Sequence, residues 1–78
     1  MNQQDFIKDF ESQFDDLEPG IITLATELES IEEWSSLQAL VIISMLDSKY
    51  KIRATTSELQ EAKTVGNIYE LVQAKQNG

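Results

Sequence analysis

The stretch Trp34-Ser35-Ser36-Leu37 stands where an acidic, loop-like segment gives way to a long apolar run. A serine at such a boundary can cap a helix, so we expect a helix that begins at Ser35 or Ser36 and runs to about Tyr50. Five of its side chains gather on one arc of about 100°, the width of a stripe that faces a core. They are Ala39, Ile42, Ile43, Leu46 and Tyr50.

The same helix carries a second apolar line on its opposite side, formed by Leu37, Val41 and Met45 at intervals of four residues. In a chain of 78 residues we do not expect both faces of one helix to be buried completely. This line is therefore expected to be partly exposed beside Ser36. The alternative is that residues 21–34 cover it, and the periodicity is compatible with both arrangements.

Three further helices are predicted around this one. The first follows Asn2, a capping residue, and presents an aromatic stripe until Pro19 and Gly20 stop it. The stripe consists of Phe6, Phe10 and Phe14, with Leu17 after them. A short helix is predicted by the capping box Thr55-Thr56-Ser57-Glu58. A last helix begins at Thr64 and places Val65, Ile68, Leu71 and Val72 at helical spacing.

Residues 21–34 form a long connection with too many apolar side chains for a free linker: Ile21, Ile22, Leu24, Leu28, Ile31 and Trp34. We expect this connection to pack on the helices, and a short helix after Thr23 is compatible with it. The predicted fold is therefore all-α, a small helical bundle of three main helices plus one short helix, with a long loop between the first and second helices. Residues 1–78 are expected to form a single domain.

The composition excludes several kinds of chemistry. The chain has no histidine and no cysteine, so the usual zinc and copper sites, Ser-His triads, thiol nucleophiles and disulfides cannot be built from its side chains. We expect no catalytic residues and no metal site, and hence no enzyme. The chain has neither a secretory segment nor an apolar stretch long enough to span a bilayer, which predicts a soluble, cytoplasmic protein.

The net charge of −8 argues against binding to nucleic acid or to a membrane of anionic lipid, because both are themselves negative. The charge is concentrated in residues 1–34, where ten acidic side chains face Lys8 alone, a net charge of −9. This distribution favours a partner protein with a basic surface. A simpler interpretation also holds, because many small domains are acidic only for solubility.

From Ser35 to Val65 the chain resembles the acyl carrier proteins and their peptidyl carrier relatives. The shared features are the Ser36-Leu37 pair, the apolar helix ending in an aromatic at Tyr50, the short capped helix, and Thr64-Val65-Gly66 at the start of the last helix. The segment of residues 21–34 also resembles the loop of that family, in which a tryptophan just ahead of the serine is a common variant.

The resemblance implies that Ser36 is the functional residue. In the family the matching hydroxyl is esterified to 4'-phosphopantetheine by a magnesium-dependent phosphopantetheinyl transferase. The arm carries acyl or aminoacyl groups as thioesters to acyl-loading and acyl-transfer enzymes, and the carrier itself does no chemistry. A helix start suits this role, because its free amides and positive dipole end lie beside the phosphate. The resemblance also implies a monomer.

Two departures from the family pattern bear on the partners. Ser35 stands where most acyl carriers have an aspartate that helps to engage the transferase. Val41 replaces a prominent acid of the recognition helix, whereas Asp47 is retained, and Lys49, Lys51 and Arg53 make the far end of the helix basic. We therefore expect a specialised lipid or secondary-metabolite pathway rather than general fatty acid biosynthesis. Partner contacts are expected at Leu37, Val41, Met45 and Asp47.

Two alternatives remain open at this point. The chain could be an acidic helical interaction module without a cofactor, with Leu37, Val41 and Met45 as its binding seam and the serines only as caps. It could also be a degenerate carrier that has lost modification because of Ser35. If it is a carrier, we expect the cargo to enter between the helices, within a core that opens only partly because it is aromatic. Phe6, Phe10, Leu46 and Tyr50 are the residues expected to form that core.

Overall fold

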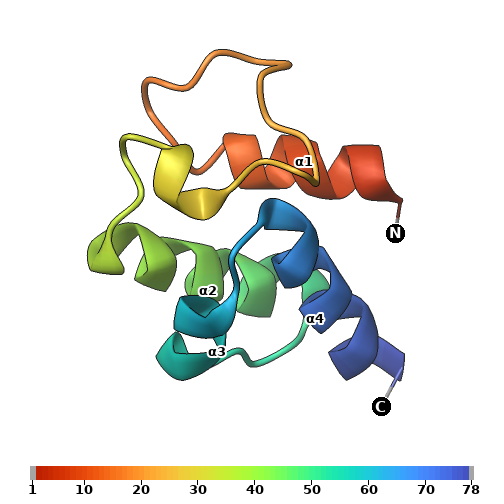
Figure 1. Ribbon diagram of the computed structural model, residues 1–78. Helices are drawn as coiled ribbons and strands as arrows, with labels where there is room; N and C mark the ends of the chain where they lie inside the picture. Colours follow the sequence, from red (N-terminus) through yellow and green to blue (C-terminus); the bar gives the residue numbers. More distant parts are fainter. Residues whose placement is uncertain (1, 78) are drawn as a thin grey trace.

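The computed structural model describes residues 2–77, and this part of the chain contains four α-helices and one 3-10 turn. The helices are α1 (Gln3–Glu11), α2 (Ser36–Tyr50), α3 (Thr56–Glu61) and α4 (Val65–Asn77), and the turn η1 spans Leu28–Ser30. In Figure 1, α1 and the long loop lie at the top, with α2, α3 and α4 below them. The predicted all-α fold of three main helices, one short helix and a long first loop is confirmed.

Local side-chain caps fix where the helices begin. At α1, Asn2 Oδ1 accepts a hydrogen bond from the Asp5 amide at 2.8 Å. At α3, Thr55 Oγ1 accepts from the Glu58 amide at 3.2 Å, and Glu58 Oε1 accepts from the Thr55 amide at 2.9 Å. The predicted capping box is therefore present, with both of its hydrogen bonds formed.

The start of α4 is held by the long loop as well as by its own cap. Thr64, the predicted first residue, directly precedes the helix. The Val65 amide donates to the Thr26 carbonyl at 3.0 Å, and the Gly66 amide donates to the Leu24 carbonyl at 2.8 Å. Backbone carbonyls of the loop thus satisfy two of the amides that a helix start leaves without partners. This attachment explains why the loop packs on the bundle instead of behaving as a free linker.

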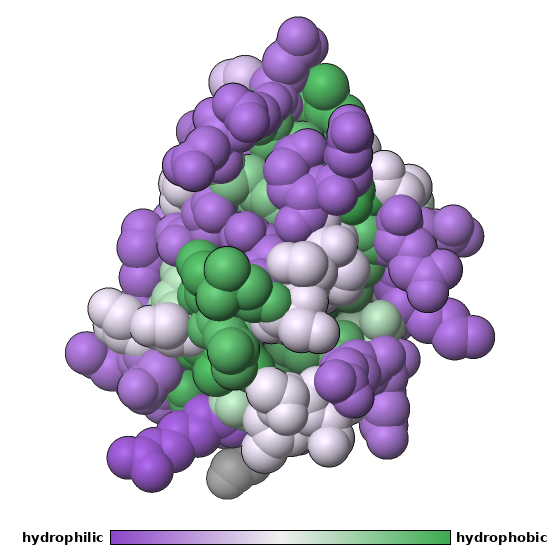
Figure 2. All heavy atoms as spheres, turned by 90° about the vertical axis from the view of Figure 1, so that its left-hand side faces the viewer, coloured by the Kyte–Doolittle hydropathy of each residue, from purple (hydrophilic) through white to green (hydrophobic). Residues whose placement is uncertain are grey.

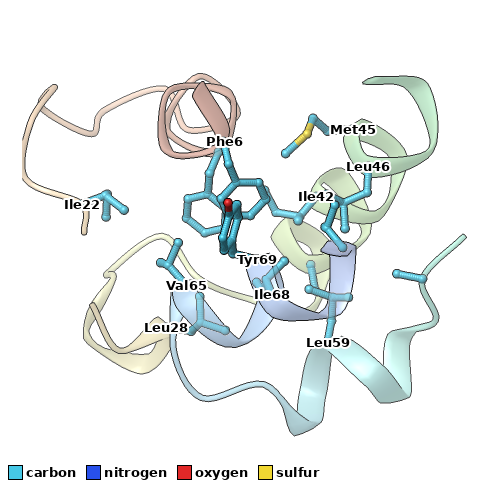
Figure 3. Close-up of a cluster of buried hydrophobic side chains, with 14 of the residues drawn as sticks. Phe6, Ile22, Leu28, Ile42, Met45, Leu46, Leu59, Val65, Ile68 and Tyr69 are labelled. Atoms are coloured by element: carbon cyan, nitrogen blue, oxygen red, sulfur yellow. The ribbon is translucent and has the colours of Figure 1, made fainter. Parts of the chain in front are cut away.

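One continuous core joins the helices and the loop (Figure 3). The long loop contributes Ile22, Leu28 and Ile31 to it, and η1 is the short helical element expected after Thr23. Of the arc predicted on α2, Ala39, Ile42 and Leu46 are buried, while Ile43 and Tyr50 are partly buried against the core. The aromatic side chains of α1 pack in series, with ring centroids of Phe6 and Phe10 6.3 Å apart.

The first helix is shorter than the aromatic stripe predicts, because α1 ends at Glu11 and Phe14 lies beyond it. Ser12 Oγ donates to the Asp9 carbonyl at 2.7 Å, and Gln13 Nε2 donates to the same oxygen at 3.3 Å. Such side-chain bonds compete with the backbone bonds that would continue the helix. A helix through Phe14 is therefore wrong, although Phe14 is buried and lies 5.2 Å from Phe10 between ring centroids.

Candidate functional site

The two serines at the start of α2 have different roles in the structure. Ser35 is the cap: its backbone is extended, and its Oγ accepts a hydrogen bond from the Gln38 amide at 3.1 Å. Ser36 is the first residue of the helix, and its side chain is exposed. Among residues 2–77, no hydrogen-bond partner of the Ser36 hydroxyl is found. The hydroxyl of Ser36 is therefore free for chemistry, whereas that of Ser35 stabilises the helix.

The surroundings of Ser36 favour a negatively charged group. The first backbone bond of the helix joins the Ala39 amide to the Ser35 carbonyl at 2.9 Å, which leaves the amides of Ser36 and Leu37 without an acceptor in the described part of the chain. No acidic side chain lies in the first turn of α2. No acidic side chain of α2 itself thus neutralises the positive end of the helix dipole, which suits a phosphate attached to the Ser36 hydroxyl.

A cavity of about 280 Å³ opens beside Ser36, between the end of the long loop, α2 and α3. Its lining is mainly apolar and consists of Trp34, Ser35, Ser36, Ala39, Leu40, Thr56, Leu59 and Gln60. On one side Trp34 stacks against Phe10, with ring centroids 6.3 Å apart and planes inclined by 25°. Leu59 is almost completely buried. The attachment point predicted from the sequence therefore lies at the mouth of a small apolar cavity.

On the side of the molecule where α2 begins, the surface carries a group of exposed apolar side chains (Figure 2). Leu37 is 71% exposed and Leu40 is 50% exposed, one helical turn apart. Sequence analysis did not single out Leu40, although it stands at helical spacing from both Ser36 and Leu37 and could have been found on that ground. We call Leu37 and Leu40 the apolar patch of α2.

The predicted line of Leu37, Val41 and Met45 does not form one exposed seam. Leu37 is exposed, Val41 is half-buried, and Met45 is only 5% exposed. The segment after α1 adjoins this side of α2: Gln38 Nε2 donates to the Gln13 carbonyl at 2.9 Å, and Gln13 shares a surface hollow with Val41 and Met45. An exposed position for Met45 is therefore wrong, and the covering segment follows α1 rather than lying within residues 21–34.

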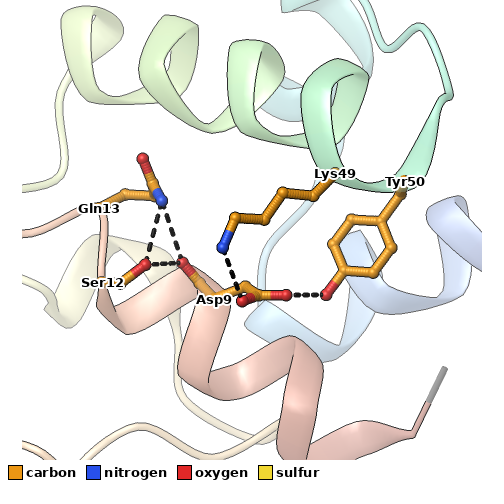
Figure 4. A network of polar contacts seen from close by, with 5 residues as sticks. All are labelled: Asp9, Ser12, Gln13, Lys49 and Tyr50. Atoms are coloured by element: carbon orange, nitrogen blue, oxygen red, sulfur yellow. Dashed lines mark hydrogen bonds and ion pairs between the residues drawn. The ribbon is translucent and has the colours of Figure 1, made fainter.

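The far end of α2 is tied to α1 by a polar network (Figure 4). Asp9 accepts hydrogen bonds from the Tyr50 hydroxyl and from Lys49 Nζ, the latter at 3.0 Å. Burial by itself raises the pKa of Asp9, but these two hydrogen bonds and the charge of Lys49 outweigh it and lower that pKa. Burial and the bond to Asp9 raise the pKa of Tyr50. Lys49 is thus engaged within the protein.

Asp47 is exposed on α2, three turns from Ser36, and Lys51 and Arg53 are exposed beyond the helix. Lys51 has a positive φ of 58°, which ends the helix without a glycine. Within residues 2–77, no three acidic side chains are grouped so that they could bind a metal ion. No helix in the same range is long and apolar enough to cross a membrane.

No protein-family model and no curated protein matches the sequence. The structure is similar to the solution NMR structure of a holo acyl carrier protein from Geobacter metallireducens, with a TM-score of 0.79. The two chains are 33% identical, and the similarity covers 99% of this chain and 88% of the other. The identity extends over nearly the whole of both chains. The serine-leucine pair at the start of α2 is a second feature that this chain shares with the pattern of the family. The chain therefore belongs to the acyl carrier protein family.

Proposed function

We propose that this protein carries acyl groups as thioesters on a 4'-phosphopantetheine arm attached to Ser36 Oγ. The observation that carries the proposal is the division of roles between the two serines. Ser35 already caps α2 through its bond to the Gln38 amide, so the exposed hydroxyl of Ser36 can be esterified without loss of the cap. A protein in which both hydroxyls were needed for capping would lose helix stability on modification.

Attachment of the arm needs a separate phosphopantetheinyl transferase and coenzyme A. Ser36 Oγ attacks the phosphorus that bears the pantetheine chain, and a new P–O bond forms. The bond of the pyrophosphate bridge breaks, adenosine bisphosphate leaves, and the hydroxyl proton passes to a base on the transferase. The free amides of Ser36 and Leu37 then lie beside the new phosphodiester and favour its negative charge. The arm supplies the thiol that a chain without cysteine lacks.

The apolar patch of α2 is the proposed contact surface for enzymes that act at Ser36. A catalytic base must come within hydrogen-bond reach of the Ser36 hydroxyl. Such an approach covers Leu37 and Leu40, because they lie one position and one turn from the serine. Val41 and Asp47 lie farther along the helix, and we expect them to touch only the edge of a bound enzyme. Met45, which the sequence also indicated, is buried and is not expected to touch a partner.

A patch without carboxylates suits partners with an apolar recess better than partners with a basic one. This feature supports the expectation of a specialised lipid or secondary-metabolite pathway with its own transferase and ligases. The acidic residues of the long loop give the segment that leads to Ser36 a negative charge, which favours basic residues on the partner.

The decisive experiment is intact-mass measurement after incubation with coenzyme A, magnesium and a broad-specificity phosphopantetheinyl transferase. The native chain should gain one phosphopantetheine, and Ser36→Ala should gain none. Ser35→Ala is the matched control, because it removes the neighbouring hydroxyl and should still be modified. Modification that persists in Ser36→Ala would refute the assignment. A native chain that stays unmodified with several transferases would favour the interaction module or the degenerate carrier.

A further inference from the structure

The exposed side of α2 forms a stripe that starts beside Ser36 and ends just past the helix. Its members stand three or four positions apart, the spacing that places side chains on one face of a helix. All of them are exposed: Leu37, Leu40, Ser44, Asp47 and Lys51. At a rise of about 1.5 Å per residue, the two ends of the stripe are about 20 Å apart along the axis. The stripe is therefore apolar beside the serine and charged at its far end.

The far end carries positive charges that the protein itself does not pair. Lys49 forms an ion pair with Asp9 at 3.0 Å, and Figure 4 shows its side chain directed toward α1. In the part of the chain that the structure describes, neither Lys51 nor Arg53 forms an ion pair. Lys51 follows Asp47 by four positions, a spacing at which opposite charges can pair on a helix, yet no ion pair joins these two residues. Two positive charges are thus left to solvent.

Lys51 also keeps an unfavourable backbone conformation. Its φ is 58° and its ψ is 37°, the left-handed region, where helices usually end on glycine or asparagine because a Cβ costs energy there. The flanking Ile52 and Ala54 are buried, so this segment is anchored with Lys51 and Arg53 at the surface. Strained residues of this kind cluster at functional sites. A lysine at a position that favours glycine indicates that its side chain is used.

We infer that Lys51 and Arg53 dock an acidic surface of an enzyme that acts on the cargo. The inference rests on the proposed function and adds the chemistry of that partner. Because the arm separates the cargo from Ser36, such an enzyme need not crowd the serine as the transferase does, and it can cover α2 to its far end. Its recess for Leu37 and Leu40 then lies about 20 Å from its carboxylates. The net charge of −8 disfavours an anionic membrane as the occupant, because the rest of the protein would be repelled.

The test uses synthetic helical peptides as probes of the unmodified protein, so that it does not depend on the arm. Each peptide has about 15 residues, which span about 20 Å as a helix, with leucines at one end and two charged residues at the other. The charged residues are glutamates in the acidic peptide and lysines in the matched basic peptide. Dissociation constants are measured at an ionic strength of about 0.15 M, where charges more than about 8 Å apart are largely screened. Amide NMR shifts show whether the peptide lies along the stripe.

The native protein should bind the acidic peptide about fivefold more tightly than the basic one, as expected for two exposed ion pairs. Lys51→Glu combined with Arg53→Glu should reverse this preference. Lys63→Glu, at an exposed position outside the stripe, is the matched control and should leave it unchanged. Lys51→Gly should weaken the binding of the acidic peptide and raise the urea midpoint, because glycine relieves the backbone strain. If Lys51 only ended the helix, Lys51→Gly would change the stability and not the binding.

The inference is overturned if the native protein binds both peptides equally, or binds the basic one more tightly along the stripe. A preference that survives the double charge reversal also overturns it, as does tighter binding to vesicles of anionic lipid than to the acidic peptide. A chain that prefers the acidic peptide but gains no phosphopantetheine loses the proposed function and keeps this docking surface, as an interaction module. A chain that is modified at Ser36 but shows no preference loses this inference alone.

Discussion

The amide of Gly66 donates a hydrogen bond to the carbonyl oxygen of Leu24 at 2.8 Å, and a Cβ on residue 66 would lie 2.8 Å from the same oxygen. This contact brings the long loop against the first turn of α4, where the Val65 amide also bonds to Thr26. A further bond, from the Leu28 amide to the Lys63 carbonyl at 2.9 Å, continues the attachment. The loop that leads to Ser36 is therefore fixed to a helix far from it in the sequence.

Gly66→Ala should destabilise the protein. Alanine is the better helix former by about 1 kcal/mol, so helix propensity alone predicts a gain. The added Cβ, however, cannot stay 2.8 Å from a backbone oxygen, and the loop must move. We expect the free energy of unfolding in urea to fall by about 1–3 kcal/mol, as for other overpacked positions. Glu70→Ala, at an exposed position of the same helix, is the control and should change little. A Gly66→Ala protein as stable as the native one would show that the loop is not held here.

Asp9→Asn should reduce stability in a pH-dependent way. The hydrogen bonds from Tyr50 and Lys49 lower the pKa of Asp9 below its ordinary value of 3.8, despite the opposing effect of burial. When folding lowers the pKa of a carboxyl group, the ionised group stabilises the folded state at pH values above the pKa of the unfolded chain. This contribution is lost as the pH falls through the pKa of the folded protein. The native protein should therefore be more stable than Asp9→Asn at neutral pH, and the difference should disappear in acid below pH 3.8.

The urea midpoint of both proteins, followed from neutral pH into acid, measures this difference. Tyr50→Phe is the companion variant, because it removes the hydroxyl that donates to Asp9 and should cost about 1 kcal/mol at neutral pH. A stability difference between native protein and Asp9→Asn that stays constant through the acid range would contradict the assigned cause.

The features that could be predicted from the sequence are those encoded within a few residues. The caps at Asn2 and Thr55 each join a side-chain oxygen to the backbone amide three positions along the chain, and both are present in the structure. The start of α2 follows from the same local rule, since Ser35 caps it and Ser36 begins it. The choice of Ser36 as the candidate site rests on the resemblance to the acyl carrier proteins, because the local pattern leaves open which of the two serines is the cap.

The features that could not be predicted depend on how distant segments meet. Met45 is buried because α1 and the segment after it lie against α2, and that placement rests on contacts such as Lys49 to Asp9 in α1 and Gln38 to Gln13 after it. No local pattern encodes them. The end of α1 was misjudged for a related reason, because the spacing of Phe14 fits a helix while the chain reaches the same core through a turn.

Ser35→Asp should improve recognition by transferases that expect an acidic residue before the modified serine. Aspartate and serine are about equally good caps, so the bond to the Gln38 amide and the stability should be retained. We expect a higher kcat/KM with a transferase of the fatty acid type and an unchanged urea midpoint. Ser35→Ala is the opposite case: the loss of the cap should lower the free energy of unfolding by about 1 kcal/mol. If Ser35→Asp is modified no faster, residue 35 does not limit recognition.

The apolar patch of α2 should govern the rate of modification by the cognate transferase. Leu37 and Leu40 are exposed in the free protein and become covered when an enzyme reaches Ser36. Leu37→Ala and Leu40→Ala should each lower kcat/KM about fivefold, which corresponds to about 1 kcal/mol of lost apolar contact. Neither variant should change stability much, because exposed side chains contribute little to it.

Ile21→Ala is the matched control for the patch, because Ile21 is also apolar and 55% exposed but lies in the long loop rather than beside Ser36. Its kcat/KM should equal that of the native protein. kcat/KM of the native protein is then measured at several ionic strengths. If the contact is made through the two leucines, kcat/KM should depend only weakly on salt, because salt does not screen apolar contacts. If instead kcat/KM falls steeply as the salt concentration rises, and neither Leu37→Ala nor Leu40→Ala changes it, recognition depends on the acidic residues of the loop.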